Sequence, residues 1–172
     1  SFLKIGHKCH SINFYDKRKR IADMPLDHID SAYPFILMLP QRETERLLNQ
    51  KLEESKIYVE RSSELINIKQ EENGVVSTIK FHNGAAENIT SDWVIACDGA
   101  NSTIREKSQI SFPGENIQEQ FMVADAKMDS FLPADEIHVF FDKGSIFPDK
   151  STIFSAFPLG SKQYRLIANL YN

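Results

Sequence analysis

The stretch Trp93-Val94-Ile95-Ala96-Cys97-Asp98-Gly99-Ala100-Asn101-Ser102-Thr103-Ile104-Arg105 holds the most informative pattern in the sequence. Its short apolar run is typical of a strand buried on both faces, so we expect a buried strand over residues 93–97. Gly99 permits a tight turn after this strand. Ser102 or Asn101 is a favourable N-cap, which predicts a short helix over residues 103–108. In open α/β sheets, ligands bind where such strands end.

Asp98 follows the predicted strand directly and has two interpretations. Its carboxylate could accept hydrogen bonds from ribose or ribityl hydroxyl groups, or it could pair with Arg105 and stiffen the turn. An isolated Asp-Gly pair is most often only a turn. The whole stretch is more specific than the dipeptide, so Asp98, Gly99, Ser102 and Arg105 are kept as candidate site residues.

A helix and a β-meander are predicted before this stretch. An apolar extended run over 33–39 ends at Pro40, and the apolar spacing then becomes that of an amphipathic helix over 41–55. Asn-Gly pairs at 73–74 and 83–84 favour hairpins with type I′ turns, because both central residues of such a turn need a positive φ. The strand-like runs around them are 57–60, 64–71, 75–81 and 86–90.

Strand patterns also dominate both ends of the chain. A hairpin is expected from residues 8–15 and 21–26, around the polar break at 16–20. Four further strands are predicted towards the C-terminal end, at 120–127, 137–142, 152–158 and 164–170. We therefore predict an α+β fold derived from α/β, with one long helix, a β-meander and a buried strand joined to a mostly antiparallel sheet.

The composition narrows the class of protein. The 172 residues are 41% hydrophobic and 26% charged, which suits a globular chain and excludes disorder and coiled coil. A net charge of −4 disfavours nucleic acid as the main partner. No apolar run approaches the roughly 20 residues of a membrane helix. The two cysteines are typical of reduced thiols, so we expect a cytoplasmic protein without a membrane partner.

Motifs of metal, nucleophilic and phosphate-binding sites are missing. His7, Cys9 and His10 lack a second ligand pair to converge on a metal, so no metal site is predicted. No sequence pattern of a catalytic nucleophile is present. The seven glycines are never closer than ten positions, so no Gly-x-Gly-x-x-Gly turn can be drawn.

The stretch from Cys97 to Arg105 resembles the Asp-Gly fingerprint of the FAD-dependent aromatic-ring hydroxylases, the flavoprotein monooxygenases of the para-hydroxybenzoate hydroxylase type. In that family the fingerprint lies near both the flavin and the pyridine nucleotide. The segment Leu39-Pro40-Gln41-Arg42-Glu43-Thr44-Glu45-Arg46-Leu47-Leu48 is similar to the start of the family's long helix. Phe112-Pro113-Gly114, with 121–126, looks like the crossing into the substrate domain. The resemblance implies that Gln41 contacts the dinucleotide part of FAD, and that the backbone of Leu65 touches its adenine side.

The same resemblance implies an oxidoreductase in which NADH or NADPH reduces FAD, O2 adds to the flavin, and a flavin hydroperoxide hydroxylates a small, phenol-like aromatic substrate. It implies substrate-domain edge strands over 1–34, a partial FAD-binding domain over 35–110 and the substrate-domain sheet over 111–172. The family's glycine-rich turn and its Gly-Asp segment have no match in the sequence. We therefore expect an interior portion of a monooxygenase that is inactive by itself.

Within the predicted strand 137–142, His138 and Phe140 share one face by alternation and are candidate substrate contacts. Core packing is the alternative for either side chain. No catalytic residue is expected, because the cofactor carries the chemistry. Two other functions stay open: a non-enzymatic module that binds a ligand or a protein without flavin, and a flavoprotein of other chemistry, such as a halogenase or a reductase.

Overall fold

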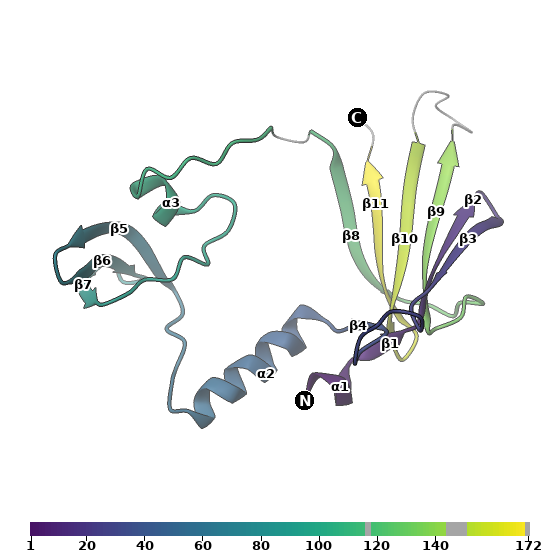
Figure 1. Cartoon of the computed structure of the whole chain (residues 1–172), viewed down its shortest axis with the longest axis horizontal. Helices are drawn as coiled ribbons and strands as arrows, with labels where there is room; N and C mark the ends of the chain where they lie inside the picture. The colour runs from purple at the N-terminus through teal and green to yellow at the C-terminus, as the bar shows by residue number, and fades with distance from the viewer. Residues whose placement is uncertain (116–117, 144–150, 171–172) are drawn as a thin grey trace. The chain divides into compact units, whose positions relative to one another are not determined.

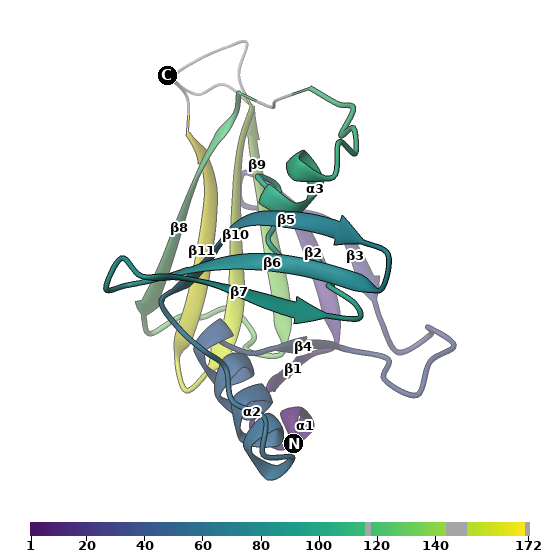
Figure 2. The same cartoon turned by 90° about the vertical axis from the view of Figure 1, so that its left-hand side faces the viewer.

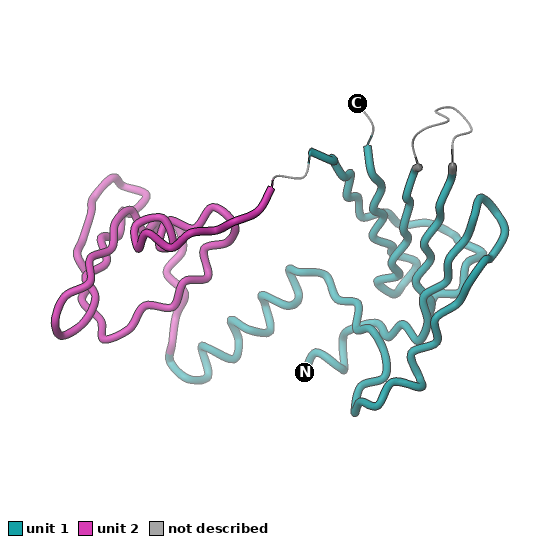
Figure 3. The backbone as a smooth tube through the Cα atoms, turned by 45° about the horizontal axis from the view of Figure 1, so that its top comes forward, with its two compact units in different colours: residues 1–56, 117–172 teal, residues 57–116 magenta. Residues whose placement is uncertain are grey.

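The computed structural model of the chain describes residues 1–115, 118–143 and 151–170. The chain divides into two compact units, one formed by residues 1–56 with 117–172 and the other by residues 57–116 (Figure 3). Among the described residues, no helix is long and apolar enough to cross a membrane.

A six-stranded sheet forms the main part of the first unit (Figure 1). All neighbouring strands are antiparallel except β2 and β9, which run parallel although they are far apart in the sequence. The predicted N-terminal hairpin and the four predicted later strands are confirmed. In order across the sheet, the strands are β3 (Lys19–Pro25), β2 (Ser11–Asp16), β9 (Glu136–Lys143), β10 (Ser151–Gly160), β11 (Gln163–Leu170) and β8 (Gln120–Lys127).

The first unit also contains α1 (Phe2–Ile5), a small antiparallel pair of β1 (His7–Cys9) and β4 (Ile36–Met38), and the long helix α2 (Gln41–Glu54). Helix α2 begins directly after Pro40, as the change in apolar spacing predicted. The core of this unit contains both apolar and polar side chains. Its fully or almost fully buried members are Cys9, Asn13, Ile137, His138, Ala156, Pro158 and Tyr164.

The second unit is the predicted meander followed by a short helix. Strands β5 (Ser63–Glu71), β6 (Gly74–Phe81) and β7 (Ala86–Ser91) lie side by side in chain order (Figure 2). Helix α3 (Thr103–Lys107) contacts β5. The side chains of Val75 and Ser77, on the central strand, are buried.

Both Asn-Gly hairpins form, but their turns are not of type I′. The glycines have positive φ, +149° at Gly74 and +83° at Gly84, whereas neither asparagine does. At Asn83 the side chain instead accepts the backbone N–H of Ala85. A Cβ at position 74 would lie 2.6 Å from the carbonyl oxygen of Ser91, so that position requires glycine.

The expected buried strand over 93–97 is wrong. These residues form no strand, and the side chains of Trp93 and Ile95 are 87% and 85% exposed. The run 57–60 also lacks strand structure. A continuous apolar strand is stabilised by neighbouring strands and by cover on both faces. Within the described part of the chain, no strand pairs with either segment.

The α+β class and the mostly antiparallel sheet are confirmed by the strand pairings. The compact units divide near residues 56 and 116, whereas the predicted domain borders were 34 and 110. The assignment of 35–110 to an FAD-binding domain, and of 1–34 and 111–172 to a substrate domain, stays a prediction.

Candidate functional site

The Asp-Gly turn of the second unit is held by hydrogen bonds to one carboxylate. Asp98 accepts the hydroxyl of Ser102 at 2.5 Å and the backbone N–H of Ile104 at 3.1 Å. The Ser102 oxygen in turn accepts the backbone N–H of Arg105 at 3.0 Å, so Ser102 caps α3 as predicted. Gly99, between the two side chains in sequence, has a φ of +82°, a conformation that glycine adopts without strain.

Arg105 does not pair with Asp98. No ion pair among the described residues joins the two side chains, so the predicted pairing is wrong. The Arg105 guanidinium instead donates to the carbonyl oxygen of Ala100 at 2.7 Å and lies 4.4 Å above the ring of Phe112. Arg105 therefore stiffens the turn through the backbone and a cation–π contact.

The hydrogen bonds in the turn hold Asp98 in its charged form. The pKa of Asp98 lies below its ordinary value, first because of the Ser102 hydroxyl and second because of the Ile104 N–H. An ionised carboxylate has about four acceptor positions, and the Asp98 side chain is exposed. Asp98 can therefore accept further hydroxyl groups while it keeps the turn together.

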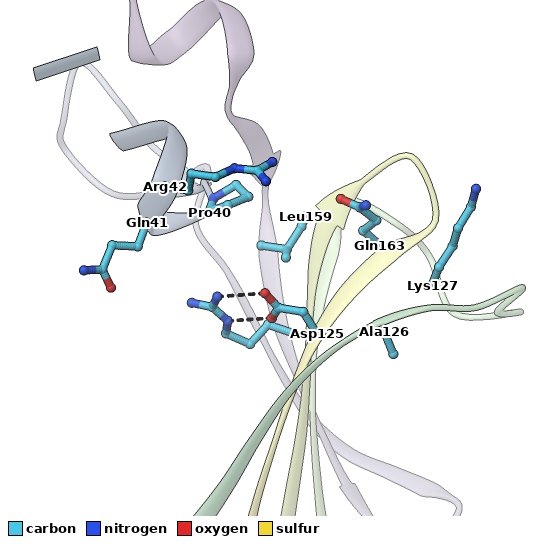
Figure 4. A pocket seen from close by; sticks show the side chains of 9 residues that line it. Pro40, Gln41, Arg42, Asp125, Ala126, Lys127, Leu159 and Gln163 are labelled. Atoms are coloured by element: carbon cyan, nitrogen blue, oxygen red, sulfur yellow. Dashed lines mark hydrogen bonds and ion pairs between the residues drawn. The ribbon is translucent and has the colours of Figure 1, made fainter. Parts of the chain in front are cut away.

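A pocket of about 490 Å³ lies in the first unit, where the start of α2 approaches β8, β10 and β11 (Figure 4). It includes Gln41, one of the predicted cofactor contacts. The Gln41 amide donates to Glu45 at 3.0 Å, and in Figure 4 its side chain points away from Asp125. The residues lining the pocket are Pro40, Gln41, Arg42, Asp125, Ala126, Lys127, Leu159, Gln163 and Arg165.

One wall of this pocket carries an ion pair that the sequence analysis missed. Asp125 on β8 and Arg165 on β11 are directly opposite in the register. Arg165 donates to both carboxylate oxygens, from Nε at 2.8 Å and from Nη2 at 3.0 Å. These bonds lower the pKa of Asp125 and raise that of Arg165. The signal in the sequence was that Asp125 and Arg165 are charged residues inside two largely apolar strands. Their pairing can be predicted only from the sheet register.

The candidate substrate residue His138 is fully buried and bonded on both sides of its ring. Its Nε2 lies 3.1 Å from the carbonyl oxygen of Pro133, so Nε2 donates there. Nδ1 is then the acceptor for the hydroxyl of Tyr15 at 3.2 Å. The ring of Phe140 stacks on Tyr15 with centroids 4.7 Å apart. Both side chains therefore have the packing contacts that were the alternative to substrate binding.

The sheet register puts His138 and the pocket on opposite faces. His138 is in register with Ala156, which is in register with Leu166. Arg165 precedes Leu166, and adjacent residues of a strand point to opposite faces. The pocket face therefore carries Arg165 and Asp125, whereas the other face carries His138.

The sequence-predicted site residues fall in both units. Gln41, His138 and Phe140 belong to the first unit, and the remaining five belong to the second. Leu65 lies on β5, in register with Ile79, and is half-buried. The structure brings Asp98, Ser102 and Arg105 together at one turn. Among the residues that the structure describes, no group of three or more His, Cys, Asp or Glu could hold a metal ion.

The FAD-binding domain family matches residues 3–169 of the chain. The chain belongs to this family. Together with the relatives and solved structures described next, this match confirms the resemblance to FAD-dependent aromatic hydroxylases.

Two monooxygenases are among the curated relatives of the chain. Pentachlorophenol 4-monooxygenase of Sphingobium chlorophenolicum is 28% identical over 170 residues, which are 96% of this chain and 30% of that protein. The 12-dehydrotetracycline 5-monooxygenase/anhydrotetracycline 6-monooxygenase of Streptomyces rimosus is 30% identical over 145 residues, 83% of this chain and 29% of that protein. The chain thus spans less than a third of the length of these relatives.

Solved structures share the fold. The crystal structure of p-nitrophenol 4-monooxygenase from Pseudomonas putida superposes with a TM-score of 0.84 at 19% identity, covering 98% of this chain and 42% of that one. A flavin-dependent halogenase superposes with a TM-score of 0.75 at 15% identity, covering 98% of this chain and 30% of that one. The fold therefore accommodates more than one flavin chemistry.

Proposed function

We propose that the chain is part of an FAD-dependent monooxygenase that hydroxylates a phenol-like aromatic substrate with NADH or NADPH and O2. One observation carries the proposal: the FAD-binding family match extends over residues 3–169, and the curated relatives matched over most of the chain are monooxygenases, one of them named for a phenol. The activity is proposed for the whole protein, because the chain spans 30% of the pentachlorophenol enzyme.

Polar groups of the chain fit parts of FAD. Helix α2 has no side-chain cap at Pro40, so the first N–H groups of the helix can meet a polar or anionic ligand at the pocket. Gln41 stands at this position, and its amide would have to leave Glu45 to bind the cofactor. In the second unit, the exposed carboxylate of Asp98 suits ribose or ribityl hydroxyl groups.

When bound, FAD would supply the redox chemistry, accepting reducing equivalents from NADH or NADPH and passing them to O2. The residues of the chain would bind FAD and orient it. Ser102 and Ile104 hold the Asp98 carboxylate charged and in place, which leaves it ready to accept cofactor hydroxyls. Gly99 has no atom within 4 Å of a potential Cβ, so a ligand can approach the backbone there. No residue need act as acid, base or nucleophile.

Halogenation is the second candidate, because a flavin-dependent halogenase shares the fold at a TM-score of 0.75. The sequence relatives favour monooxygenation, since the 28% and 30% identical proteins are both monooxygenases. A binding module without flavin would not need the Asp-Gly turn to keep a charged, exposed carboxylate.

The test uses the protein encoded by the complete gene. Flavin content is measured by absorbance, and oxidation of NADH and of NADPH is followed with a panel of phenols. Mass spectrometry of the product under isotopically labelled O2 should show one added oxygen atom from O2. Absence of bound flavin, or a product that has gained a halogen atom instead of an oxygen atom, would overturn the proposal.

A matched pair of variants examines the turn in the same protein. Asp98→Ala should lower the flavin content, because it removes an acceptor for the cofactor hydroxyls and loosens the turn. Asp92→Ala removes an exposed carboxylate only six positions away and should leave the flavin content unchanged. Equal flavin content in the two variants would contradict a role of Asp98 in cofactor binding.

A further inference from the structure

The two edge strands of the six-stranded sheet, β3 and β8, differ in their protection against pairing with another chain. Strand β3 contains three charged residues and ends at Pro25, and its register with β2 shifts between Phe14 and Tyr15. Charges, a proline and a bulge are the usual features that prevent an edge strand from pairing with a further strand. The edge formed by β3 is therefore protected.

Strand β8, at the other edge, lacks these features over most of its length (Figure 1). Its first five residues, 120–124, contain neither a charge nor a proline, and its register with β11 has no shift. The side chains of Phe121, Met122 and Val123 are 53%, 43% and 59% exposed. In the described part of the chain, β11 is the single strand beside β8. A regular, apolar and exposed edge of this kind is a template for a further strand.

The sequence of β8 fits a second copy of the same strand. In an antiparallel pair related by a two-fold axis, opposite residues share a face of the sheet, so the axis passes beside one residue of each copy. With the axis at Val123, each Glu119 lies opposite Lys127 of the other copy, and both side chains are exposed. Asp125 then lies opposite Phe121, and its charge already has a partner on β11. This register therefore adds two pairs of opposite charge.

Other positions of the axis are less favourable. An axis at Met122 would place Glu119 opposite Asp125 of the other copy, and an axis at Asp125 would place the two Asp125 carboxylates opposite each other. Like charges directly opposite destabilise a strand pair. An axis at Ala124 brings no opposite charges together within β8. The charge pattern therefore favours the axis at Val123.

We propose that β8 is the interface between two copies of the protein, paired antiparallel about a two-fold axis at Val123. The two sheets then form one continuous sheet across the interface. The assembly closes at two copies, because each β8 edge is used once and the β3 edges are protected. The inference goes beyond the proposed function and does not rest on it.

The test measures the mass and the dimer dissociation constant of the protein encoded by the complete gene, by sedimentation equilibrium. Val123→Lys places two ammonium groups opposite each other at the axis, so the dissociation constant should rise by roughly three- to ten-fold. An equimolar mixture of Val123→Lys and Val123→Glu should recover the dimer, because opposite charges then meet. Ile21→Lys is the matched control on β3, where the side chain is 56% exposed, and it should leave the constant unchanged.

Glu119 and Lys127 test the register. Glu119→Lys should also weaken the dimer, because the new lysine meets Lys127 of the other copy, and the further change Lys127→Glu should restore the dimer. Amide exchange over residues 120–127 gives a second readout. Protection of this strand should increase with protein concentration, and it should decrease in Val123→Lys. Circular dichroism establishes that the sheet is intact in each variant.

A monomer, or a dimer that Val123→Lys leaves unchanged, would overturn the inference. Equal losses in Val123→Lys and Ile21→Lys would also overturn it, as would an assembly larger than a dimer. Concentration-independent protection of the outer edge of β8 in a monomer would mean that another part of the same chain covers this strand. The dissociation constant does not depend on hydroxylation, so failure of the proposed function is distinguishable from failure of this inference.

Discussion

Ser102 and Asp98 are joined by a hydrogen bond of 2.5 Å, and the same Ser102 oxygen accepts the backbone N–H of Arg105. One buried hydroxyl group thus connects the carboxylate after the apolar run to the first turn of α3. The Asp-Gly turn is therefore a closed hydrogen-bonded unit, which explains why both an acidic residue and a serine stand at these positions.

Ser102→Ala should reduce the free energy of unfolding of the second unit by about 1 kcal/mol, because α3 loses its N-cap. The urea dependence of amide exchange in β5, β6 and β7 measures the change in this unit. Ser108→Ala, at the other end of the helix, is the control and should change the free energy of unfolding by only about a few tenths of a kcal/mol. Equal stability of the two variants would contradict the capping role.

The turn should weaken in acid. Hydrogen bonds lower the pKa of Asp98 in the folded chain, so its stabilising effect is complete above the unfolded pKa of about 3.9 and is lost as the pH falls through the lower folded value. Amide exchange of Ile104, whose N–H is bonded to Asp98, should therefore lose protection below about pH 4. In Asp98→Asn, the protection of Ile104 should not fall in this pH range. A loss of protection that persists in this variant would mean that another group causes it.

His138→Phe keeps an aromatic ring but leaves the Tyr15 hydroxyl and the Pro133 carbonyl without their partner. We expect a loss of roughly 1 to 3 kcal/mol in the free energy of unfolding, the usual cost of unsatisfied buried polar groups. Urea unfolding measures it, with His82→Phe at an exposed position as the control. Unchanged stability together with weaker binding of aromatic ligands would instead favour the substrate role of His138.

Local signals were sufficient for most elements of the fold. The change of apolar period after Pro40 predicted α2, and Ser102 predicted the start of α3. The prediction of a buried strand over 93–97 was wrong. The hydrophobicity of these residues favours burial, but a buried strand also requires neighbouring strands. No strand pairs with this segment in the described ranges, and the side chain of Trp93 is 87% exposed.

The candidate site was predictable only where it is local. Asp98, Ser102 and Arg105 lie within eight positions, and their motif was recognised, although Arg105 bonds to the Ala100 carbonyl instead of Asp98. Asp125 and Arg165 are 40 positions apart, so their pairing depends on which strands become neighbours. The parallel pairing of β2 with β9 is equally non-local.

The turn between β10 and β11 shows how tertiary contacts override turn propensity. Its two loop residues, Ser161 and Lys162, have φ values of +51° and +62°, the type I′ combination that was expected at the Asn-Gly pairs. The Lys162 side chain bonds to Asp129 at 2.5 Å, and its carbonyl accepts the N–H of Met128. These contacts with the segment after β8 hold two residues in a conformation that non-glycine residues disfavour.

Replacing this loop by Asn-Gly, through S161N and K162G together, should therefore raise the free energy of unfolding by about 1 kcal/mol. The exposed ion pair of Lys162 is lost, but such pairs contribute only about 0 to 1 kcal/mol, and the backbone contact with Met128 remains. Thermal unfolding measures the gain. The same exchange at the β5–β6 loop, E72N with N73G, is the control and should give no gain, because neither residue there has a positive φ. A gain in the control but not at 161–162 would contradict backbone strain at Ser161 and Lys162.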